Sequence, residues 1–388
     1  MRQRDTYRRE SLVLIDLADA EPAMSGGKAA VLARLLGAGL PIPPGFVVPI
    51  AAYEQAVDGP SAELVNEIAQ ALPRIGGGYV AVRSSATSED TAHATAAGQH
   101  DTFLGVRGPD QVADAVRRCW ASLRSERAVA YWRRQGDPGS PTIAVLVQRL
   151  VDADVAGVMF TGDDVRLEAS WGLGESVVSG HVTPDSWVVS GDAVTRRTLG
   201  TKTTRIDRTV AREVEPADRD RFCLTDDEVT RLARLGRQIA DLLGGPQDIE
   251  WAIADSRVWI LQARPVTSSL PAAPAAAAGD GTARAGTPAS PGSATGPVRV
   301  VRGPADFARV RPGDVLVCRT TDPAWTPLFG VVAAVVTETG GLLSHAAIVA
   351  RELGLPAVLA IPDATTALPD GAPVEVDGST GRVALLDC

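Results

Sequence analysis

Apolar and polar residues along this chain follow two periods, one typical of strands and one of helices. Short apolar runs bounded by turn residues predict strands at YVAVRSS (79–85), IAVLVQRLV (143–151), VAGVMFT (155–161) and LFGVVAAVV (328–336). Apolar residues spaced three and four apart predict amphipathic helices in SGGKAAVLARLLGAG (25–39) and DDEVTRLARLGRQIADLLG (226–244). The mixture indicates an α+β protein.

The segment QDIEWAIADSRVWILQARPVT (247–267) predicts a hairpin whose register can be argued from burial. A three-residue loop at 255–257 is a common length, and it makes Asp248 face Arg264 and Glu250 face Gln262. A one-residue shift would set the apolar face of each strand beside the polar face of the other. The expected apolar face carries Ile249, Trp251, Ile253, Trp259 and Leu261.

The polar face of this hairpin brings two carboxylates, an amide and a guanidinium together at its open end. Mg²⁺ prefers oxygen ligands and commonly takes one or two carboxylates, with phosphate and water at its other positions. From the hairpin alone, a magnesium site and a surface patch of salt bridges remain equal alternatives.

A histidine lies between a glycine pair and an apolar helix in GGLLSHAAIVAREL (340–353). Ser344 is the expected N-cap of that helix. The unpaired amides and the dipole of the first turn favour an anion and a neutral His345 ring, and two glycines would let a bulky group approach. This pattern predicts a phosphohistidine site, with a capping or packing histidine as the alternative. The other three histidines, at 93, 100 and 181, share no ligand spacing with it.

The segment from Ser268 onward, SSLPAAPAAAAGDGTARAG, is rich in Ala, Pro and Gly and predicts a flexible linker. A length of 388 residues is long for a single core, so we expect two domains. The predicted organisation is a first domain at 1–267, a linker at 268–284 and a small second domain at 285–388. A free linker of this length has a root-mean-square span of about 20–25 Å and a limit of about 55 Å.

Composition excludes several classes of protein. A net charge of −9 argues against a nucleic-acid binder, because the phosphate backbone favours a basic surface. The apolar runs are far shorter than the roughly 20 residues that cross a bilayer, so no membrane segment is expected. The four cysteines show no metal-ligand spacing, which predicts reduced thiols in a cytoplasmic protein. Only two of the 38 basic residues are lysines, Lys28 and Lys202, so each lysine is a candidate for a special role.

The motif TETGGLLSHAAIVARELGLPAVL (337–359) resembles the phosphohistidine signature of the phosphoenolpyruvate-utilising dikinases, which include phosphoenolpyruvate synthase, pyruvate phosphate dikinase and rifampin phosphotransferase. Upstream, GGKAAVLARLLGAGLPIPPGFVV, AVRSSATSED, GQHDTFLGV, EASWGLGESVVSGHVTPD and the 247–267 hairpin resemble the ATP-grasp domain of that family, in the same order. The resemblance implies an α+β ATP-grasp domain joined by a flexible linker to a small swivelling α/β phosphohistidine domain.

The resemblance also implies roles for the matching residues. His345 would carry the phosphoryl group, with Lys28 and Arg83 as further catalytic residues that contact the nucleotide phosphates. The remaining implied roles are Thr102 beside the phosphates, Gln148 beside the adenine, Glu250 and Gln262 as Mg²⁺ ligands, Arg264 as a phosphate clamp and Asp248 as their support. ATP and Mg²⁺ are the implied cofactors, and AMP and inorganic phosphate would be the products beside phosphohistidine.

The chain departs from the family pattern in carrying no segment of acceptor-domain size between or after these motifs. A TIM barrel needs about 250 residues, so we expect this chain alone not to phosphorylate pyruvate. The preferred hypothesis is a phosphotransferase that serves a small-molecule acceptor, for example in secondary metabolism. One alternative is a phosphoryl-donor subunit that needs a separate acceptor protein. An alternative of another class is a catalytically silent nucleotide-binding regulator.

Overall fold

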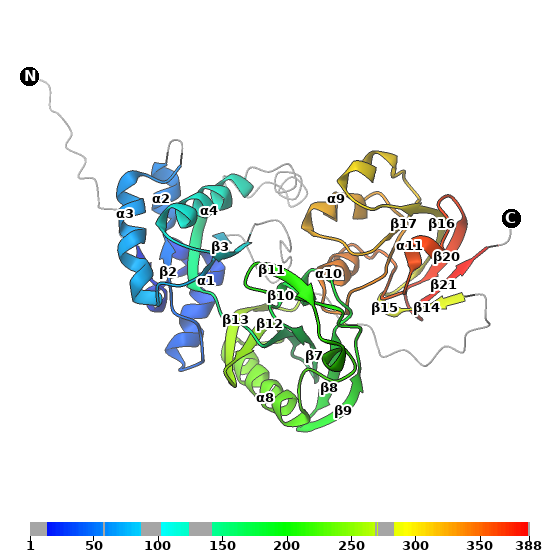
Figure 1. The fold of residues 1–388 in the computed structure, drawn as a ribbon, viewed down its shortest axis with the longest axis horizontal. Coiled ribbons are helices and arrows are strands. Elements are labelled where there is room, and N and C mark those ends of the chain that lie inside the picture. Colours follow the sequence, from blue (N-terminus) through cyan, green and yellow to red (C-terminus); the bar gives the residue numbers. More distant parts are fainter. Residues whose placement is uncertain are drawn as a thin grey trace, which may run out of the picture.

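The computed structural model describes residues 14–386, except for 57–58, 87–101, 124–141, 268–269 and 271–282. The elements fall into three groups, each built on one β-sheet (Figure 1). The predicted linker therefore lies almost wholly outside the described residues, as do His93, His100 and Cys388. Ala283 and Arg284, which we expected in the linker, instead belong to a strand because they pair with Ala384 and Val383.

The first sheet has five strands and is covered by helices of the N-terminal segment. Its strands, in spatial order, are β1 (Ile15–Asp16), β2 (Gly45–Val48), β5 (Ile143–Arg149), β3 (Val80–Ala86) and β4 (Thr102–Val106). Its helices are α1 (Pro22–Gly37), α2 (Ile50–Gln55), α3 (Ala62–Ala71) and α4 (Pro109–Ser122). α3 and α4 pack on one face, whereas α1 contacts both this sheet and β13 of the second sheet.

The second sheet has six strands and carries the 247–267 hairpin at one edge. Its strands, in spatial order, are β13 (Arg257–Pro265), β12 (Gln247–Ala254), β6 (Val155–Phe160), β7 (Asp164–Trp171), β8 (Asp185–Ser190) and β9 (Ala193–Thr198). The accompanying elements are the hairpin β10 (Thr204–Asp207) and β11 (Val210–Glu213) and the helices α6 (Glu175–Val178), α7 (Pro216–Arg219) and α8 (Asp226–Leu243). The amphipathic helix expected at 226–244 is confirmed, with a capping box formed by Thr225 and Glu228.

The third sheet has eight strands and forms the C-terminal unit. Its strands, in spatial order, are β14 (Ala283–Ala285), β21 (Arg382–Leu385), β20 (Pro373–Asp377), β16 (Ser293–Val300), β17 (Val315–Cys318), β18 (Ala334–Thr337), β19 (Ala357–Leu359) and β15 (Thr287–Ser290). Its helices are α9 (Thr326–Phe329), α10 (His345–Glu352) and α11 (Ala364–Ala367). The strand expected at 328–336 is wrong in part, because Leu328 and Phe329 end α9 and the strand begins only at Ala334.

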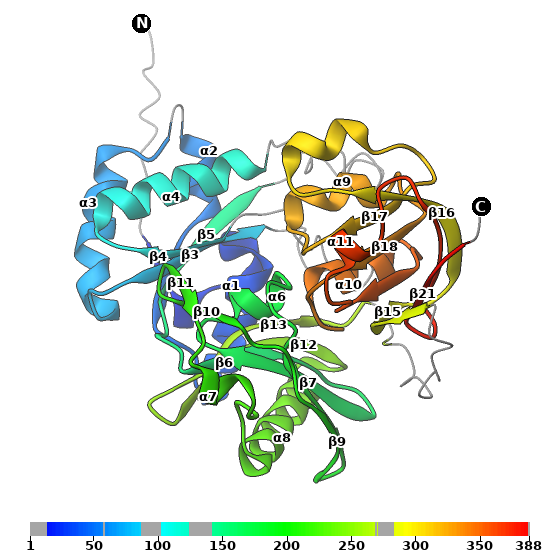
Figure 2. The same ribbon diagram turned by 45° about the vertical axis from the view of Figure 1, so that its right-hand side comes forward.

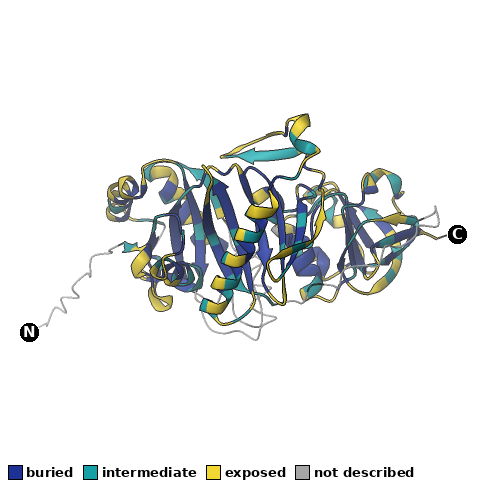
Figure 3. Ribbon diagram, turned by 90° about the horizontal axis from the view of Figure 1, so that it is seen from below, coloured by how far each residue is buried: buried dark blue, intermediate teal, exposed yellow. Residues whose placement is uncertain are grey.

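Burial follows this three-sheet arrangement. The strands are mostly buried, whereas the helices expose their outer faces (Figure 3). The largest apolar cluster joins α1 to α8 across one face of the second sheet, and includes Ile249, Trp251 and Ile253 of β12. The opposite face of the second sheet is therefore the one left for a site. No helix in the described part of the chain is long and apolar enough to cross a membrane.

Lys202, one of the two lysines, is fully buried with Asp185. Its Nζ lies 2.6 Å from Asp185 Oδ1 and also donates to the carbonyl oxygens of Gly200 and Arg219, each at 3.3 Å. The second oxygen of Asp185 accepts the Cys223 amide at 2.8 Å. This compact ammonium, satisfied by three oxygens, fixes the loop after β9, so Lys202 has a structural role.

We therefore predict that Lys202→Met lowers the free energy of unfolding by about 3–5 kcal/mol, because it leaves the Asp185 carboxylate buried without its cation. Urea unfolding followed by circular dichroism measures this. Arg208→Met breaks an exposed ion pair with Asp152 and is the matched control. Equal effects of the two substitutions would contradict the structural role of Lys202.

Candidate functional site

The hairpin of β12 and β13 keeps the expected pairs but reaches them differently. Its turn has two residues, Asp255 and Ser256, both with positive φ, so the predicted three-residue loop is wrong. Arg257 already pairs with Ala254 in β12. A β-bulge after Glu250 then shifts the register by one residue, which restores the expected pairs Asp248–Arg264 and Glu250–Gln262.

The same bulge changes which apolar residues share a face. Ile249, Trp251 and Ile253 face the α8 core as expected, but Val258 and Ile260 join them there. Trp259 and Leu261, expected on that face, lie instead among residues of the opposite one, with Ala252. They form an apolar cluster beside the polar residues of the hairpin, and the guanidinium groups of Arg149 and Arg257 lie over the Trp259 ring.

An ion pair joins the first sheet to the second at this face. Arg83 of β3 donates from Nη2 to Glu250 Oε2 at 2.6 Å and from Nη1 to the Leu261 carbonyl at 2.7 Å. Two residues further along the same two strands, Arg264 Nε donates to Asp248 Oδ2 at 2.8 Å. Both pairs are largely shielded, since the four side chains are 7–21% exposed. The structure thus brings Arg83, Glu250, Asp248 and Arg264 together as expected.

Lys28 reaches the same place through a break in α1. Gly26 has a φ of 71°, and a Cβ there would lie 2.0 Å from the Ser85 carbonyl oxygen, so only glycine permits this close approach to β3. The break lets Ala29 N donate to Ser85 Oγ and places Lys28 Nζ 3.4 Å from the Ser84 carbonyl. Lys28 Nζ therefore lies against the residue that follows Arg83 in β3.

Thr102 and Gln148 lie on the same face of the first sheet as Arg83. Thr102 pairs directly with Arg83 across β3 and β4, and it is exposed at the edge of a hollow of about 830 Å³ between β4 and the β10–β11 hairpin. Gln148 pairs with Ala81, two residues from Arg83 along β3. Its amide nitrogen donates one hydrogen to the Pro43 carbonyl at 2.9 Å, which fixes the orientation of the side-chain amide.

Glu250 and Gln262 fit a magnesium ion as ligands. They pair across β12 and β13, so a carboxylate and an amide oxygen lie side by side on one face. This hard-oxygen set is too small to bind the ion alone, which suits Mg²⁺ shared with nucleotide phosphates. No cluster of three or more His, Cys, Asp or Glu side chains suited to a metal occurs within the described ranges.

The strand register carries this face across the second sheet. Glu250 pairs with Val158 of β6, and Val158 pairs with Glu168 of β7. Paired residues point to the same side, so the Glu168 side chain lies two strands, roughly 10 Å, from Glu250 on the same face. Sequence reasoning missed Glu168. The available signal was a charged residue between Leu167 and Ala169, both of which are buried in the α8 core.

The C-terminal unit packs on this end of the face (Figures 1 and 2). Leu343 and Ile348, on either side of the α10 N-terminus, lie in one apolar cluster with Val158 and Phe160 of β6. His345 is the first residue of α10 and is 6% exposed, with its Nε2 3.4 Å from Thr326 Oγ1. The helix that begins with the phosphohistidine candidate is therefore docked on β6, next to the strand that carries Asp248 and Glu250.

Glu168 contacts the loop that precedes His345. Its Oε1 accepts the Leu342 amide at 2.6 Å and its Oε2 accepts the Leu343 amide at 3.0 Å. A Cβ on Gly341 would lie 2.2 Å from Glu168 Oε2, so this glycine leaves room for the carboxyl group. We had expected it to leave room for a bulky group at the His345 ring. Burial raises the pKa of Glu168 to about 7, and the two amides oppose that shift.

One expectation about the α10 N-terminus needs correction. Ser344 is at the N-cap, but its hydroxyl donates to the Gly341 carbonyl at 2.8 Å and forms no side-chain cap. The hydroxyl therefore closes the turn rather than satisfying a helix amide. Further contacts between the units meet at the Gly180 turn, where Thr320 Oγ1 and Thr339 Oγ1 donate to the Gly180 carbonyl at 3.0 and 2.7 Å.

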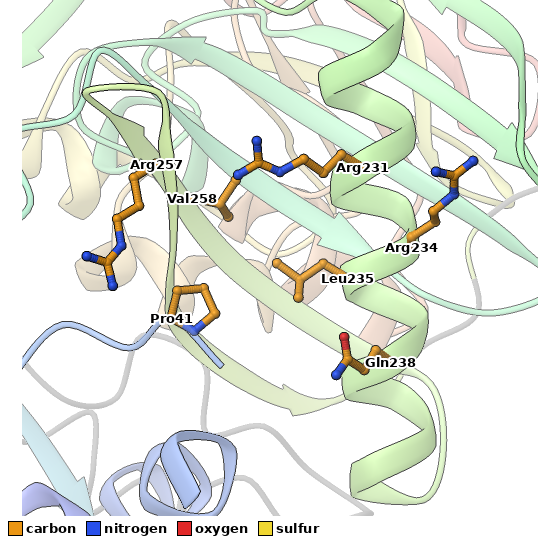
Figure 4. Close-up of a pocket in the computed structure, with 7 residues that line it drawn as sticks. All are labelled: Pro41, Arg231, Arg234, Leu235, Gln238, Arg257 and Val258. Carbon is orange, nitrogen blue, oxygen red and sulfur yellow. The ribbon is translucent and has the colours of Figure 1, made fainter. Parts of the chain in front are cut away.

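A second hollow, of about 360 Å³, lies between α8 and the β12–β13 turn and is lined by three arginines (Figure 4). Arg234 already pairs with Asp192 at 3.1 Å, and the Arg257 guanidinium stacks 3.9 Å from the Trp259 ring centroid. Because α8 covers the face opposite to Glu250, this hollow is not part of the candidate site.

Comparison with known proteins adds a family to this geometry. Residues 59–282 match the family model described as pyruvate phosphate dikinase, AMP/ATP-binding domain, and residues 310–381 match the PEP-utilising enzyme, mobile domain. The chain belongs to the phosphoenolpyruvate-utilising dikinase family. The family models place the ion pairs of the hairpin in the nucleotide-binding domain and His345 in the mobile domain.

Curated members of the family are similar over most of this chain. A probable phosphoenolpyruvate synthase of Methanothermobacter thermautotrophicus is 40% identical over 95% of this chain and 62% of its own length. The phosphoenolpyruvate synthases of Pyrococcus furiosus and Pseudomonas aeruginosa are 39% and 40% identical, over 85% and 83% of this chain and 44% and 46% of their own lengths. The chain thus spans about three fifths or less of these relatives.

We predict that Glu250→Gln removes the Mg²⁺-dependent part of nucleotide affinity, because an amide replaces the one carboxylate of the candidate ligand pair. Calorimetric titration with a non-hydrolysable ATP analogue should show at least about tenfold weaker binding in Mg²⁺ and little change in EDTA, a loss of about 1.4 kcal/mol or more. Glu375→Gln, on β20 of the C-terminal unit, is the control. An unchanged ratio of the two affinities would remove Glu250 from the ligand set.

Proposed function

We propose that this chain is an ATP-dependent phosphotransferase that forms a phosphohistidine at His345 and passes the phosphoryl group to a small-molecule acceptor. The observation that carries the proposal is the docking of α10 on the same sheet face as Arg83, Glu250, Asp248 and Arg264. A histidine at this position follows the carboxyl end of β18, where α/β sheets commonly place reacting groups.

The proposed reaction consumes ATP, one water and the His345 imidazole. A ring nitrogen bonds to the β-phosphorus as the bond from that phosphorus to the AMP oxygen breaks, and water releases the γ-phosphoryl group as inorganic phosphate. Lys28 and Arg83 would bind the phosphates, with Thr102 on the same side and Gln148 beside the adenine. Mg²⁺ held by Glu250 and Gln262 would neutralise phosphate charge.

A second candidate function follows from the lengths of the relatives. The phosphoenolpyruvate synthases matched here extend well beyond the region shared with this chain. We propose as the alternative that phosphorylated His345 delivers its phosphoryl group to an acceptor site outside these 388 residues, on a separate acceptor protein or on further protein sequence. Pyruvate is the first acceptor to test, because it is the substrate that the name of these relatives implies.

Incubation with ATP and Mg²⁺ and no acceptor tests the proposal. We expect AMP and about one acid-labile phosphate per chain, and loss of both in His345→Ala. His181→Ala, which changes an exposed histidine, should behave like the unchanged protein. The proposed function would be refuted if the protein binds the nucleotide but neither labels His345 nor forms AMP, both without an acceptor and with candidate acceptors present. Transfer to pyruvate by the chain alone would favour the first candidate over the second.

A further inference from the structure

The contact between Glu168 and the histidine loop differs from the rest of the interface between the units. One carboxyl group accepts two consecutive amides, those of Leu342 and Leu343, through both of its oxygens. The group is 4% exposed, and Gly341 lets it approach the backbone closely. Further hydrogen bonds between the two units come from the hydroxyl groups of Thr267, Thr320 and Thr339.

We propose that Glu168 is a positioning residue that seats the His345 loop on the nucleotide face and makes docking of the mobile domain sensitive to the charge at His345. The proposal rests on the proposed function for its role in catalysis, but the docking it describes can be measured without ATP. Only Ser344 separates Leu343 from His345, so the Cα atoms of Leu343 and His345 lie within about 7 Å of each other.

Charge is the feature that gives Glu168 this role. The charged groups that act on it are Arg351 of α10 and Arg166 of β7, while Asp248 also acts on Arg351. A phosphoryl group on His345 would bring about −1.5 to −2 charges close to this buried carboxyl group. Like-charge repulsion would then weaken docking once transfer has occurred. The unphosphorylated loop would dock, and the phosphorylated loop would leave for the acceptor.

The sign of the pH dependence follows from the Glu168 pKa, which is about 7 when docked and 4.5 for an ordinary exposed glutamate. Docking therefore takes up a proton between these two values. The docked state is favoured at low pH. The equilibrium constant for docking falls by at most about tenfold per pH unit as the pH rises toward 7, and it is constant above pH 7. Glu168→Gln has no such proton and should dock independently of pH.

Small-angle X-ray scattering on the full chain without ATP measures docking from pH 5.5 to 8. We expect the unchanged protein to expand as the pH rises and Glu168→Gln to keep one radius of gyration throughout. Thr320→Val, which removes a hydrogen bond to the Gly180 turn without changing charge, should dock less but keep the pH dependence. Gly341→Ala should be expanded at every pH, because its Cβ collides with Glu168.

The single-turnover rate of His345 labelling at saturating ATP connects docking to the proposed function. This rate should follow the docked fraction with pH in the unchanged protein and should lose that pH dependence in Glu168→Gln. The proposal is overturned if Glu168→Gln and the unchanged protein show the same pH dependence of radius and rate. If neither the unchanged protein nor Glu168→Gln is labelled at His345, the proposed function fails. The scattering comparison alone then decides whether Glu168 controls docking.

Discussion

Side chains at paired positions of β13, β12, β6 and β7 point to one side of the second sheet, and this alternation positions the whole candidate site. Gln262, Glu250, Val158 and Glu168 form one row across these strands. The opposite side is filled by the α8 core, so burial of that core forces the polar groups to face the first sheet and the mobile domain. A one-residue shift in the register of any one strand would move its site residue to the opposite face of the sheet.

Along the strands, the same face changes in character over a few residues. Ala252 and Trp259 make one end apolar, Glu250 with Arg83 makes the middle charged, and Phe160 offers an apolar seat for Leu343 at the other end. A nucleotide has the same sequence of properties, from base to phosphates. The α10 helix packs at the Phe160 end of this face, away from Trp259.

Much of the fold followed from sequence because periodicity reports which side of an element is buried. The pairs Asp248–Arg264 and Glu250–Gln262 were correct although the turn was not, since the bulge cancelled the one-residue error. An Asp-Ser turn with positive φ at both residues has little sequence signal, which explains that error. The sequence shows Glu168 only as a charged residue within an apolar strand, because its role depends on β7 pairing with β6 and on contact with a distant unit.

In the chain, the residues between Pro265 and Ala283 connect the nucleotide domain to the docked histidine unit. A flexible linker of that length, as the sequence predicts, would hold a domain at an effective concentration on the order of millimolar around its docking site. An interface of a few hydrogen bonds and one small apolar cluster then needs only a comparably weak affinity to be half occupied. A docking equilibrium near half occupancy responds most steeply to small changes in free energy. A weak contact would therefore let the domain leave after one phosphoryl transfer and return for the next.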